Sequence, residues 1–179
     1  MHPMTESNLH NAFAGESMAH MRYLNYARVA DKEGFPNVAR LFRAVSFAEE
    51  IHASNHLRKM DRKGAPVAGE VPLGLGKTAQ NLEFGIMGET FEILEMYPVY
   101  FEVAKYQGEK AAMQTFDWAW QAEKVHQKMF TEAKALVDGG KDWKPAKLHI
   151  CEVCGWTVEG DAPDPCPVCG AKKKQFREF

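Results

Sequence analysis

Ala48-Glu49-Glu50-Ile51-His52 places a glutamate and a histidine three residues apart, and the pattern returns as Ala122-Glu123-Lys124-Val125-His126. On a helix, residues i and i+3 lie on one face about a turn apart, so a carboxylate and an imidazole at this spacing converge on one point. Both groups are metal ligands. The two stretches therefore predict a metal site built on helices.

A further glutamate precedes each of these stretches at nearly the same distance. Gly15-Glu16-Ser17 lies 33 residues before Glu49, and Gly88-Glu89-Thr90 lies 34 residues before Glu123. The sequence therefore predicts a duplicated pair of helices, with one glutamate on the first helix of each pair.

Apolar residues recur every three or four positions through four long segments, which is the pattern of helices with one face in a core. We expect these helices at about 6–32, 37–62 and 79–106, and from Gly108 to Gly139. Pro98 should kink the third helix near its middle. The Gly- and Pro-rich segment 64–76 is long enough to cross the bundle from end to end, which predicts ferritin-like connectivity.

The composition is that of an ordinary globular protein. The 179 residues carry 22 basic and 24 acidic side chains, a net charge of -2, and 45% hydrophobic residues. The hydrophobic fraction is sufficient for a substantial core. The net charge is too small to attract nucleic acid or an anionic membrane. No apolar run reaches the roughly 20 residues that span a bilayer, and the first residues do not have the form of a secretory signal. We expect a cytoplasmic protein.

All four cysteines lie in the last 29 residues, as two C-x-x-C pairs separated by 11 residues. In a reducing compartment this spacing favours one tetrahedral four-thiolate metal site over disulfides, and zinc and iron both suit it. Its ligands would be Cys151, Cys154, Cys166 and Cys169. A glycine after each pair, Gly155 and Gly170, allows a tight turn that points backbone N–H groups at the sulfurs.

A short segment before the cysteines has the composition of a linker. It contains two glycines, Pro145 and three lysines between Gly139 and Lys147. We therefore expect one domain at 1–146, including the linker at about 139–146, and a second at 147–179.

Potential ligands lie near the midpoints of all four predicted helices and therefore at one level of the bundle. They are Glu16, Glu49, His52, Glu89, Glu92, Glu123 and His126. A buried ionised carboxylate costs several kcal/mol unless it is paired, and no Lys or Arg lies on the stripes beside them. Two divalent ions, or an oxo-bridged trivalent pair, would supply a charge of +4 against a charge near -5 from five carboxylates and two neutral imidazoles. Oxygen-rich ligands with one nitrogen per metal suit iron or manganese.

The third segment, Gly88-Glu89-Thr90-Phe91-Glu92 running on to Glu95-Met96-Tyr97-Pro98, resembles the rubrerythrin family, and the resemblance extends over essentially the whole chain. It implies a mainly α protein, a ferritin-like four-helix bundle with a small C-terminal rubredoxin-like β domain. It also implies two Fe ions in a carboxylate-bridged site and one Fe in an Fe(Cys)4 site. The seven bundle residues match the family's iron ligands, and Tyr23 and Tyr97 match tyrosines beside that site.

The resemblance also implies how the ligands behave. The second carboxylate of the third helix, here Glu92, and the histidine of the second, here His52, exchange as ligands to one iron when the redox state changes. Glu92 has no counterpart in the first repeat, where Ala19 takes the equivalent position. We therefore expect His52 to be the mobile ligand and His126 the fixed one. In the family the rubredoxin domain approaches the di-iron site of another subunit, which implies a homodimer or higher homo-oligomer.

The implied activity is reduction of hydrogen peroxide to water in oxidative stress defence, with Glu92, His52, Tyr23 and Tyr97 nearest the chemistry. The chain has no G-x-G-x-x-G dinucleotide fingerprint. Electrons from NAD(P)H would therefore arrive through a separate reductase or a rubredoxin and pass through the thiolate site. The alternatives are a ferroxidase or iron-handling protein of ferritin type, and a binding module whose cysteine domain holds zinc for protein contacts.

Weaker signals receive simpler interpretations. The segment Gly74-Leu75-Gly76-Lys77-Thr78 resembles the end of a P-loop, but the required first glycine would fall on Val71, so we expect a loop leading to a helix N-cap at Thr78. His20 is either a partner for a ligand oxygen or a bundle histidine with a partner of its own. His56 and His10 have weaker cases as site residues.

Overall fold

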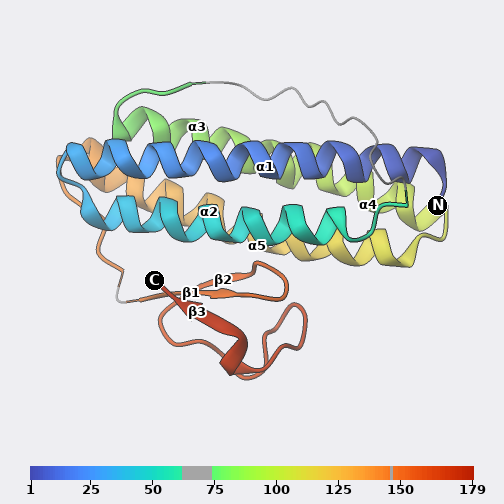
Figure 1. Cartoon of the computed structure of the whole chain (residues 1–179). Coiled ribbons are helices and arrows are strands. Elements are labelled where there is room, and N and C mark those ends of the chain that lie inside the picture. Colours follow the sequence, from blue (N-terminus) through green and yellow to red (C-terminus); the bar gives the residue numbers. More distant parts are fainter. Residues whose placement is uncertain (62–73, 146) are drawn as a thin grey trace.

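The computed structural model describes residues 1–61, 74–145 and 147–179. Its α-helices are α1 (Pro3–Lys32), α2 (Pro36–Leu57), α3 (Thr78–Phe91), α4 (Tyr97–Tyr106) and α5 (Lys110–Asp138). A π-helical turn, η1 (Glu92–Met96), joins α3 to α4, so these three elements form one rod. The result is the expected bundle of four long helical rods (Figure 1). Within the described ranges, no helix is both long enough and apolar enough to cross a membrane.

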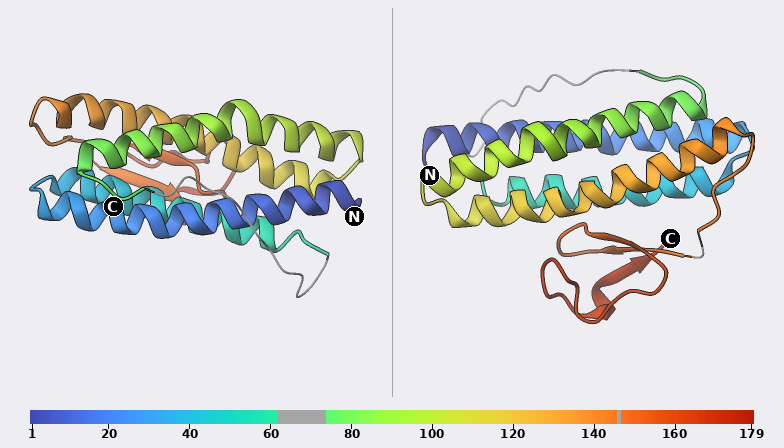
Figure 2. Two further views of the ribbon diagram at one scale, coloured as in Figure 1. Left: turned by 90° about the horizontal axis from the view of Figure 1, so that it is seen from above. Right: turned by 180° about the vertical axis from the view of Figure 1, so that it is seen from behind.

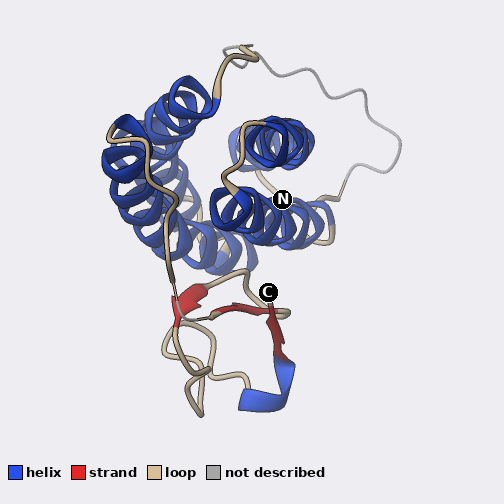
Figure 3. Cartoon of the chain, turned by 90° about the vertical axis from the view of Figure 1, so that its left-hand side faces the viewer, coloured by secondary structure: helices blue, strands red, loops and turns tan. Residues whose placement is uncertain are grey.

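The four rods pack as two pairs, α1 with α2 and the α3–α4 rod with α5, as the end-on view shows (Figure 3). One end of the core is a cluster of interlocking aromatic rings from three helices. The ring centroid of Tyr23 lies 6.0 Å from that of Phe42 and 5.3 Å from that of Phe130, and the centroid of Tyr26 lies 5.4 Å from that of Phe42. Each such pair contributes about 0.5–1.5 kcal/mol beyond its area burial. This cluster holds the two pairs of helices together at one end of the bundle.

The second helix is shorter than the sequence pattern predicts, because α2 ends at Leu57 and not near Arg62. Two tertiary contacts explain the early end. The carboxylate of Glu6 accepts hydrogen bonds of 3.1 and 3.2 Å from the Asp61 backbone N–H, and the N-terminal ammonium group lies 2.7 Å from the Asp61 carboxylate. These contacts hold Asp61 near the start of α1. Helix propensity alone does not predict them, because they depend on tertiary packing.

The third helix is not simply kinked at Pro98. Proline has no N–H to donate to the carbonyl four residues earlier, and the turn before it widens. The Tyr97 N–H donates to the Glu92 carbonyl, five residues back, which is the hydrogen bond of a π-helix. The interruption therefore lies over 92–96 and begins at a predicted ligand.

The start of α3 differs from expectation by one residue. Lys77 is the N-cap, and Thr78 is the first helical residue. Its N–H donates to the carboxylate of Glu33, from the turn after α1, at 2.8 Å. The Glu33 carboxylate therefore pairs with the N–H group of Thr78 at the start of α3. The sequence pattern instead predicts a local N-cap at Thr78 itself.

The predicted crossing loop at 64–76 lies mostly outside the described residues. Its two described flanks lie at opposite ends of α1. Asp61 contacts Glu6 near the start of α1, and the Gly74 carbonyl accepts a hydrogen bond from Tyr26 near the end, at 2.7 Å. The described residues on either side of this segment therefore lie at opposite ends of the bundle, which is the placement that ferritin-like connectivity requires.

The C-terminal residues form a three-stranded antiparallel sheet in the order β2-β1-β3. Its strands are β1 (Leu148–Cys151), β2 (Thr157–Glu159) and β3 (Phe176–Glu178), and a 3-10 turn, η2 (Lys173–Gln175), precedes β3. This domain lies along the bundle beside α2 and α5 (Figure 2).

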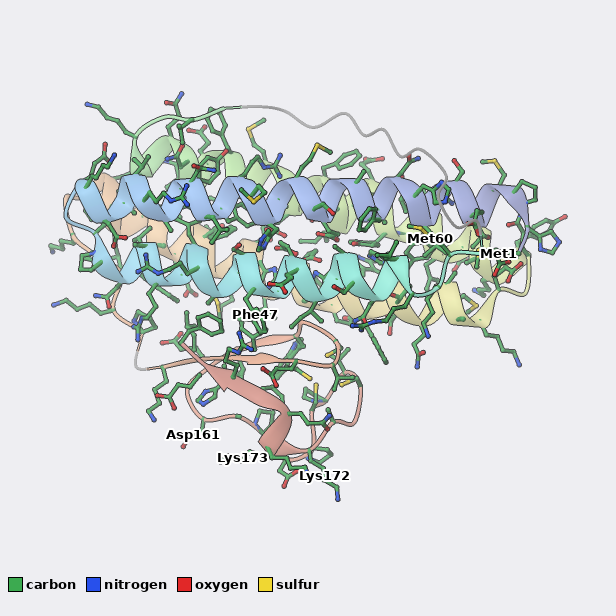
Figure 4. All side chains as sticks on the ribbon, in the orientation of Figure 1. Met1, Phe47, Met60, Asp161, Lys172 and Lys173 are labelled. Carbon is green, nitrogen blue, oxygen red and sulfur yellow. The ribbon has the colours of Figure 1, made fainter. Side chains whose placement is uncertain are left out.

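The sheet and the bundle share one hydrophobic core. Leu148 and Ile150 of β1 are fully buried and belong to the same cluster as the inward face of α2. The ring of Phe47 lies between α2 and the strand domain, 5.5 Å from that of Phe179 (Figure 4). Within the predicted linker, Trp143 is also buried in this core. The cysteine domain is therefore fixed against its own bundle.

Candidate metal centres

Six of the predicted bundle ligands converge in the centre of the molecule, where each is at most 1% exposed. Glu16 comes from α1, Glu89 from α3, and each of α2 and α5 contributes a glutamate and a histidine, because i,i+3 spacing puts the pair on one inward face. Figure 1 shows that all four rods pass through this level. The geometry brings together residues that are more than 100 positions apart in the sequence.

These residues form two overlapping groups, in each of which one ligand atom per residue lies within 4.8 Å of the others. One group contains Glu16 and His52, and the other contains Glu89 and His126. Glu49 and Glu123 belong to both groups. Two metal positions with two shared carboxylates are therefore arranged as a carboxylate-bridged dinuclear site requires.

Both imidazoles present Nδ1 to the shared carboxylates. His52 Nδ1 lies 2.9 Å from Glu49 Oε2 and 3.0 Å from Glu123 Oε1. His126 Nδ1 lies 2.7 Å from Glu123 Oε2 and 3.4 Å from Glu49 Oε1. Each histidine thus contacts the carboxylate of its own helix and that of the opposite helix.

Several buried polar atoms at this centre have no hydrogen-bond partner among the described residues. They are Glu16 Oε2, Glu49 Oε1, Glu89 Oε2, both carboxylate oxygens of Glu123, His52 Nε2 and His126 Nδ1. Buried polar atoms are rarely left unpaired, and most of these are oxygens aimed at a shared centre. The donor set fits two hard or borderline cations such as iron.

The charges at the site also indicate that it requires cations. Burial and neighbouring carboxylates raise the pKa of Glu16, Glu89 and Glu92 well above the ordinary value. Burial lowers the pKa of His126, but its contacts with Glu123 and Glu49 outweigh this and raise the pKa to about 9. Without metal the cluster therefore retains protons, which metal binding would release.

Two tyrosines hold the two unshared glutamates. The Tyr23 hydroxyl of α1 donates to Glu89 Oε1 at 2.6 Å, and the Tyr97 hydroxyl of α4 donates to Glu16 Oε1. Each half of the bundle therefore orients the glutamate of the other half. Each tyrosine therefore contacts one glutamate of the cluster.

Glu92 is the predicted ligand that belongs to neither group. It is half-buried at the start of η1, and its charge is close enough to raise the pKa of Glu16. His20 Nδ1 donates to the Ser46 carbonyl at 2.8 Å, so it is a bundle histidine with its own partner. His10 Nε2 lies 3.3 Å from Glu6 Oε1 and belongs to neither ligand group.

His56 is closer to the site than its sequence signal suggests. It is fully buried, its Nε2 lies 3.1 Å from the Tyr97 hydroxyl, and its Nδ1 lies 3.2 Å from the Thr115 hydroxyl. It therefore supports the tyrosine that orients Glu16. Its position one helical turn after His52, on the same face, was the available signal.

The four cysteines form the second metal centre. The Cys151 and Cys169 sulfurs are 3.6 Å apart, and the Cys154 and Cys166 sulfurs are 3.8 Å apart. These separations exclude disulfides, and they match the edge of about 3.8 Å in a tetrahedron with metal–sulfur bonds of about 2.3 Å. Only Cys169 of the four is partly exposed.

The two knuckles of this centre have the predicted backbone. Gly155 and Gly170 have φ angles of 80° and 77°, which favour glycine. Hydrogen bonds from the Cys154 thiol and from the backbone N–H groups of Val153 and Cys154 lower the pKa of Cys151 to about 5. The loop therefore stabilises a thiolate at Cys151, whereas burial raises the pKa of Cys169 to about 12.

The knuckle that contains Cys154 lies over the bundle centre of the same chain. Thr157 Oγ1 is 2.8 Å from His126 Nε2, and Asn55 Nδ2 donates to the Val153 carbonyl at 2.9 Å. The family resemblance predicts an approach to another subunit. In this chain the packing of β1 on α2 places the cysteine domain beside the bundle centre, and the approach to another subunit stays a prediction.

Comparison with known proteins covers both domains. A family model described as rubrerythrin matches residues 7–134, and one described as the rubrerythrin rubredoxin-like domain matches residues 149–177. Rubrerythrin-2 of Clostridium acetobutylicum is 43% identical over 98% of this chain and 97% of its own length. Nigerythrin of Nitratidesulfovibrio vulgaris is 32% identical over 98% of this chain and 86% of its own.

Solved structures agree with the sequence comparison. The structure of fully reduced, all-ferrous nigerythrin superimposes with a TM-score of 0.86 at 30% identity, over 98% of this chain and 86% of that one. With both domains matched and both ligand sets assembled, the chain belongs to the rubrerythrin family and has that family's di-iron bundle and Fe(Cys)4 domain.

Proposed function

We propose that this chain reduces hydrogen peroxide to water in oxidative stress defence, with electrons from NAD(P)H that enter through a separate reductase or rubredoxin. The observation that carries the proposal is the pair of ligand groups that share Glu49 and Glu123, in contact through His126 and Thr157 with the domain that holds the four-thiolate site. When bound, the paired irons supply the two electrons that a peroxide O–O bond takes up on cleavage, and the thiolate iron returns electrons singly.

The polypeptide contributes orientation and protons. Tyr23 and Tyr97 hold their hydroxyl protons toward Glu89 Oε1 and Glu16 Oε1, which limits how these carboxylates can turn. The centre is closed to solvent, since its six ligands are at most 1% exposed. Glu92 is less buried than the six clustered ligands and belongs to neither ligand group.

The two histidines differ in a way that supports ligand exchange at His52. Thr157 holds His126 Nε2, while His52 Nε2 has no hydrogen-bond partner among the described residues. We propose that Glu92 replaces His52 when the redox state changes and that His126 stays bound. Electron entry is proposed at Cys169, the exposed edge of the thiolate site. The functional unit is proposed to be a homodimer or higher homo-oligomer.

The test is anaerobic reduction of the full-length protein, followed by mixing with one H2O2 per bundle site or, separately, with O2. Oxidation of both bundle irons by H2O2 should be faster than oxidation by O2, and the reverse order would contradict the proposal. Glu50→Gln, an exposed neighbour of Glu49, is the matched control and should behave as wild type. Incubation with excess Fe(II) tests the ferritin-type alternative, because a storage protein retains many irons per chain.

A further inference from the structure

The two knuckles of the thiolate site differ in their exposure to solvent. Both cysteines of the first knuckle are buried, whereas the second knuckle, residues 166–170, contains the partly exposed ligand Cys169. Pro167 and Gly170 of the second knuckle are exposed, and a Cβ at Gly170 would meet nothing within 4 Å. The second knuckle is therefore the side of the thiolate site that another protein can approach.

Three exposed lysines follow this knuckle at residues 172–174, here called the lysine turn. Backbone hydrogen bonds fix the turn beside the knuckle. The Cys166 N–H donates to the Ala171 carbonyl at 2.7 Å, and a 3-10 hydrogen bond of 2.9 Å to the Lys172 carbonyl closes the turn itself. Lys172 and Lys173 lie on the side of the domain that faces away from the helices (Figure 4). The lysine turn is therefore held close to the exposed ligand and is open to solvent.

Neighbouring carboxylates do not balance the charges of the lysine turn. The other lysine and arginine side chains of the cysteine domain, Lys147 and Arg177, form ion pairs with acidic side chains at 3.1 and 3.0 Å. In the described part of the chain, the ammonium groups of the lysine turn have no such partner. Asp164 accepts a hydrogen bond of 3.3 Å from the backbone N–H of Lys173 and offsets one of the three charges. The turn therefore keeps an excess of positive charge at the surface.

This positive charge affects which proteins can approach the thiolate site. Four thiolates leave the site negatively charged even with iron bound, so without the lysines it would repel a negatively charged partner. Surface charges of opposite sign raise association rates by about 10- to 1000-fold, and salt weakens the effect. Encounters between redox proteins use small interfaces, and protein interfaces in general have an apolar centre and a polar rim. Exposed Pro167 and partly exposed Val168 provide an apolar centre here, and the lysine turn provides a charged rim.

We propose that the second knuckle and the lysine turn form the docking surface for the electron donor, and that this donor is a small redox protein with an acidic surface around its cofactor. The inference deepens the proposed function and rests on electron entry at Cys169. One electron leaves the donor's cofactor and enters the thiolate site, so the donor is oxidised by one electron and the site is reduced by one. No bond forms or breaks, and no proton is transferred.

The first test measures the electrostatic effect with small charged oxidants. The full-length protein is reduced, and oxidation of its thiolate site by ferricyanide, an anion, or by tris(phenanthroline)cobalt(III), a cation, is followed by stopped-flow absorption. The combined Lys172→Gln, Lys173→Gln and Lys174→Gln variant should react more slowly with the anion and faster with the cation, so that the ratio of the two rates changes about 10-fold. An unchanged ratio would overturn the proposal, as would two rates that change in the same direction, which is the result of a structural defect.

Three exposed lysines of the bundle provide the matched control. Replacement of Lys105, Lys110 and Lys128 by glutamine removes the same net charge from α4 and α5. This control variant should keep the wild-type ratio of the two rates. An equal change in both triple variants would show that the total charge of the protein is responsible, and this result would contradict a specific role of the lysine turn.

The second test measures docking without electron transfer. A zinc-substituted rubredoxin with an acidic surface is redox-inert, and its binding to the full-length protein is measured by calorimetry at several salt concentrations. Binding to the wild type should weaken as salt rises. The variant without the three lysines of the turn should bind about 10-fold more weakly and with a smaller salt dependence. Equal affinities of the variant and the wild type, or tighter binding of a basic cytochrome c than of the rubredoxin, would overturn the proposal.

A third measurement locates the contact. In the full-length protein with zinc in its metal sites, addition of the zinc-substituted rubredoxin should shift the backbone amide NMR signals of residues 166–174. Shifts concentrated on the bundle helices instead would contradict the proposed surface. Because none of these measurements uses peroxide, their failure is distinguishable from failure of the proposed peroxide reduction.

Discussion

The two halves of the bundle have the same ligand pattern but differ in helical geometry. In the first half, Tyr23 follows Glu16 by seven residues on a continuous α-helix. In the second half, Tyr97 follows Glu89 by eight residues, and the π-turn η1 lies between them. Seven residues are close to two α-helical turns, whereas an eighth would rotate the tyrosine by about 100° without the wider turn. The π-turn absorbs the extra residue and begins at Glu92.

The surroundings of the two tyrosines differ as well. Phe130 lies four residues after His126 and packs against Tyr23, with ring centroids 5.3 Å apart. His56 lies four residues after His52 and contacts the Tyr97 hydroxyl. A duplicated scaffold thus has one apolar and one polar tyrosine environment. The repeat therefore accounts for the ligand pattern that the two halves share. The π-turn and the different neighbours of the two tyrosines make the two metal positions unequal.

The largest effect is expected where the halves meet, at the shared carboxylates. Glu49→Ala or Glu123→Ala removes a ligand of both metal groups, whereas Glu16→Ala or Glu89→Ala removes a ligand of one. We expect the first two variants to lose both bundle irons and the other two to lose one, with the thiolate iron retained in all four. Iron content per chain measures this. Loss of both irons in Glu16→Ala would contradict the expected difference between shared and unshared carboxylates.

Metal removal should make stability depend on pH in a defined direction. Between pH 7 and 9 the unfolded chain has released its imidazole protons, while His126 of the folded metal-free chain, with its pKa raised to about 9, still holds one. The raised pKa values of Glu16, Glu89 and Glu92 act in the same direction. The free energy of unfolding should therefore fall as pH rises, by about 1.4 kcal/mol per pH unit for each proton retained. Denaturant unfolding at both pH values measures it. A free energy that rises with pH in the metal-free protein would contradict the charge assignment.

Removing one tyrosine hydroxyl at a time tests the difference between their surroundings. Tyr23→Phe removes a hydrogen bond to Glu89 and should cost about 1.5 kcal/mol. Tyr97→Phe removes a hydrogen bond to Glu16 and also leaves His56 Nε2 unpaired, so it should cost about 1–3 kcal/mol more. Urea unfolding of the metal-loaded protein provides the comparison.

A double variant sharpens that test. His56→Phe copies the phenylalanine of the second half, and in combination with Tyr97→Phe it should cost less than the sum of the two single changes. The coupling should be at least about 0.5 kcal/mol, as for residues in direct contact. Strict additivity would show that the polar contact between His56 and Tyr97 has no energetic role.

The smallest effect is expected at the ends of the helices, where each half caps the other. Asp142, which follows α5, accepts three hydrogen bonds at the start of α2, from the backbone N–H groups of Asn37 and Val38 and from the Asn37 side chain. Glu33, which follows α1, accepts one from the Thr78 N–H. Asp142→Ala should cost about 1–2 kcal/mol and Glu33→Ala about 0.5–1 kcal/mol by urea unfolding. Equal costs would argue against the difference in hydrogen bonding.

Local spacing predicts the bundle and its metal ligands because i,i+3 pairs on apolar stripes fix both face and level along a helix. It does not predict the π-turn, because one extra residue between Glu89 and Tyr97 becomes visible only when the two halves are aligned residue by residue. It undervalues His56, whose partner Tyr97 comes from a distant helix. The contact between Thr157 and His126 depends on how one domain packs on the other, which no local pattern records.

The most direct test of the account is Mössbauer spectroscopy of the full-length protein loaded with isotopically enriched iron, fully reduced, and frozen at intervals after addition of one H2O2 per chain. The account predicts that both bundle irons become ferric before the thiolate iron changes, and that the thiolate iron is oxidised afterwards as electrons return to the bundle. Oxidation of the thiolate iron first, or of only one bundle iron, would contradict it.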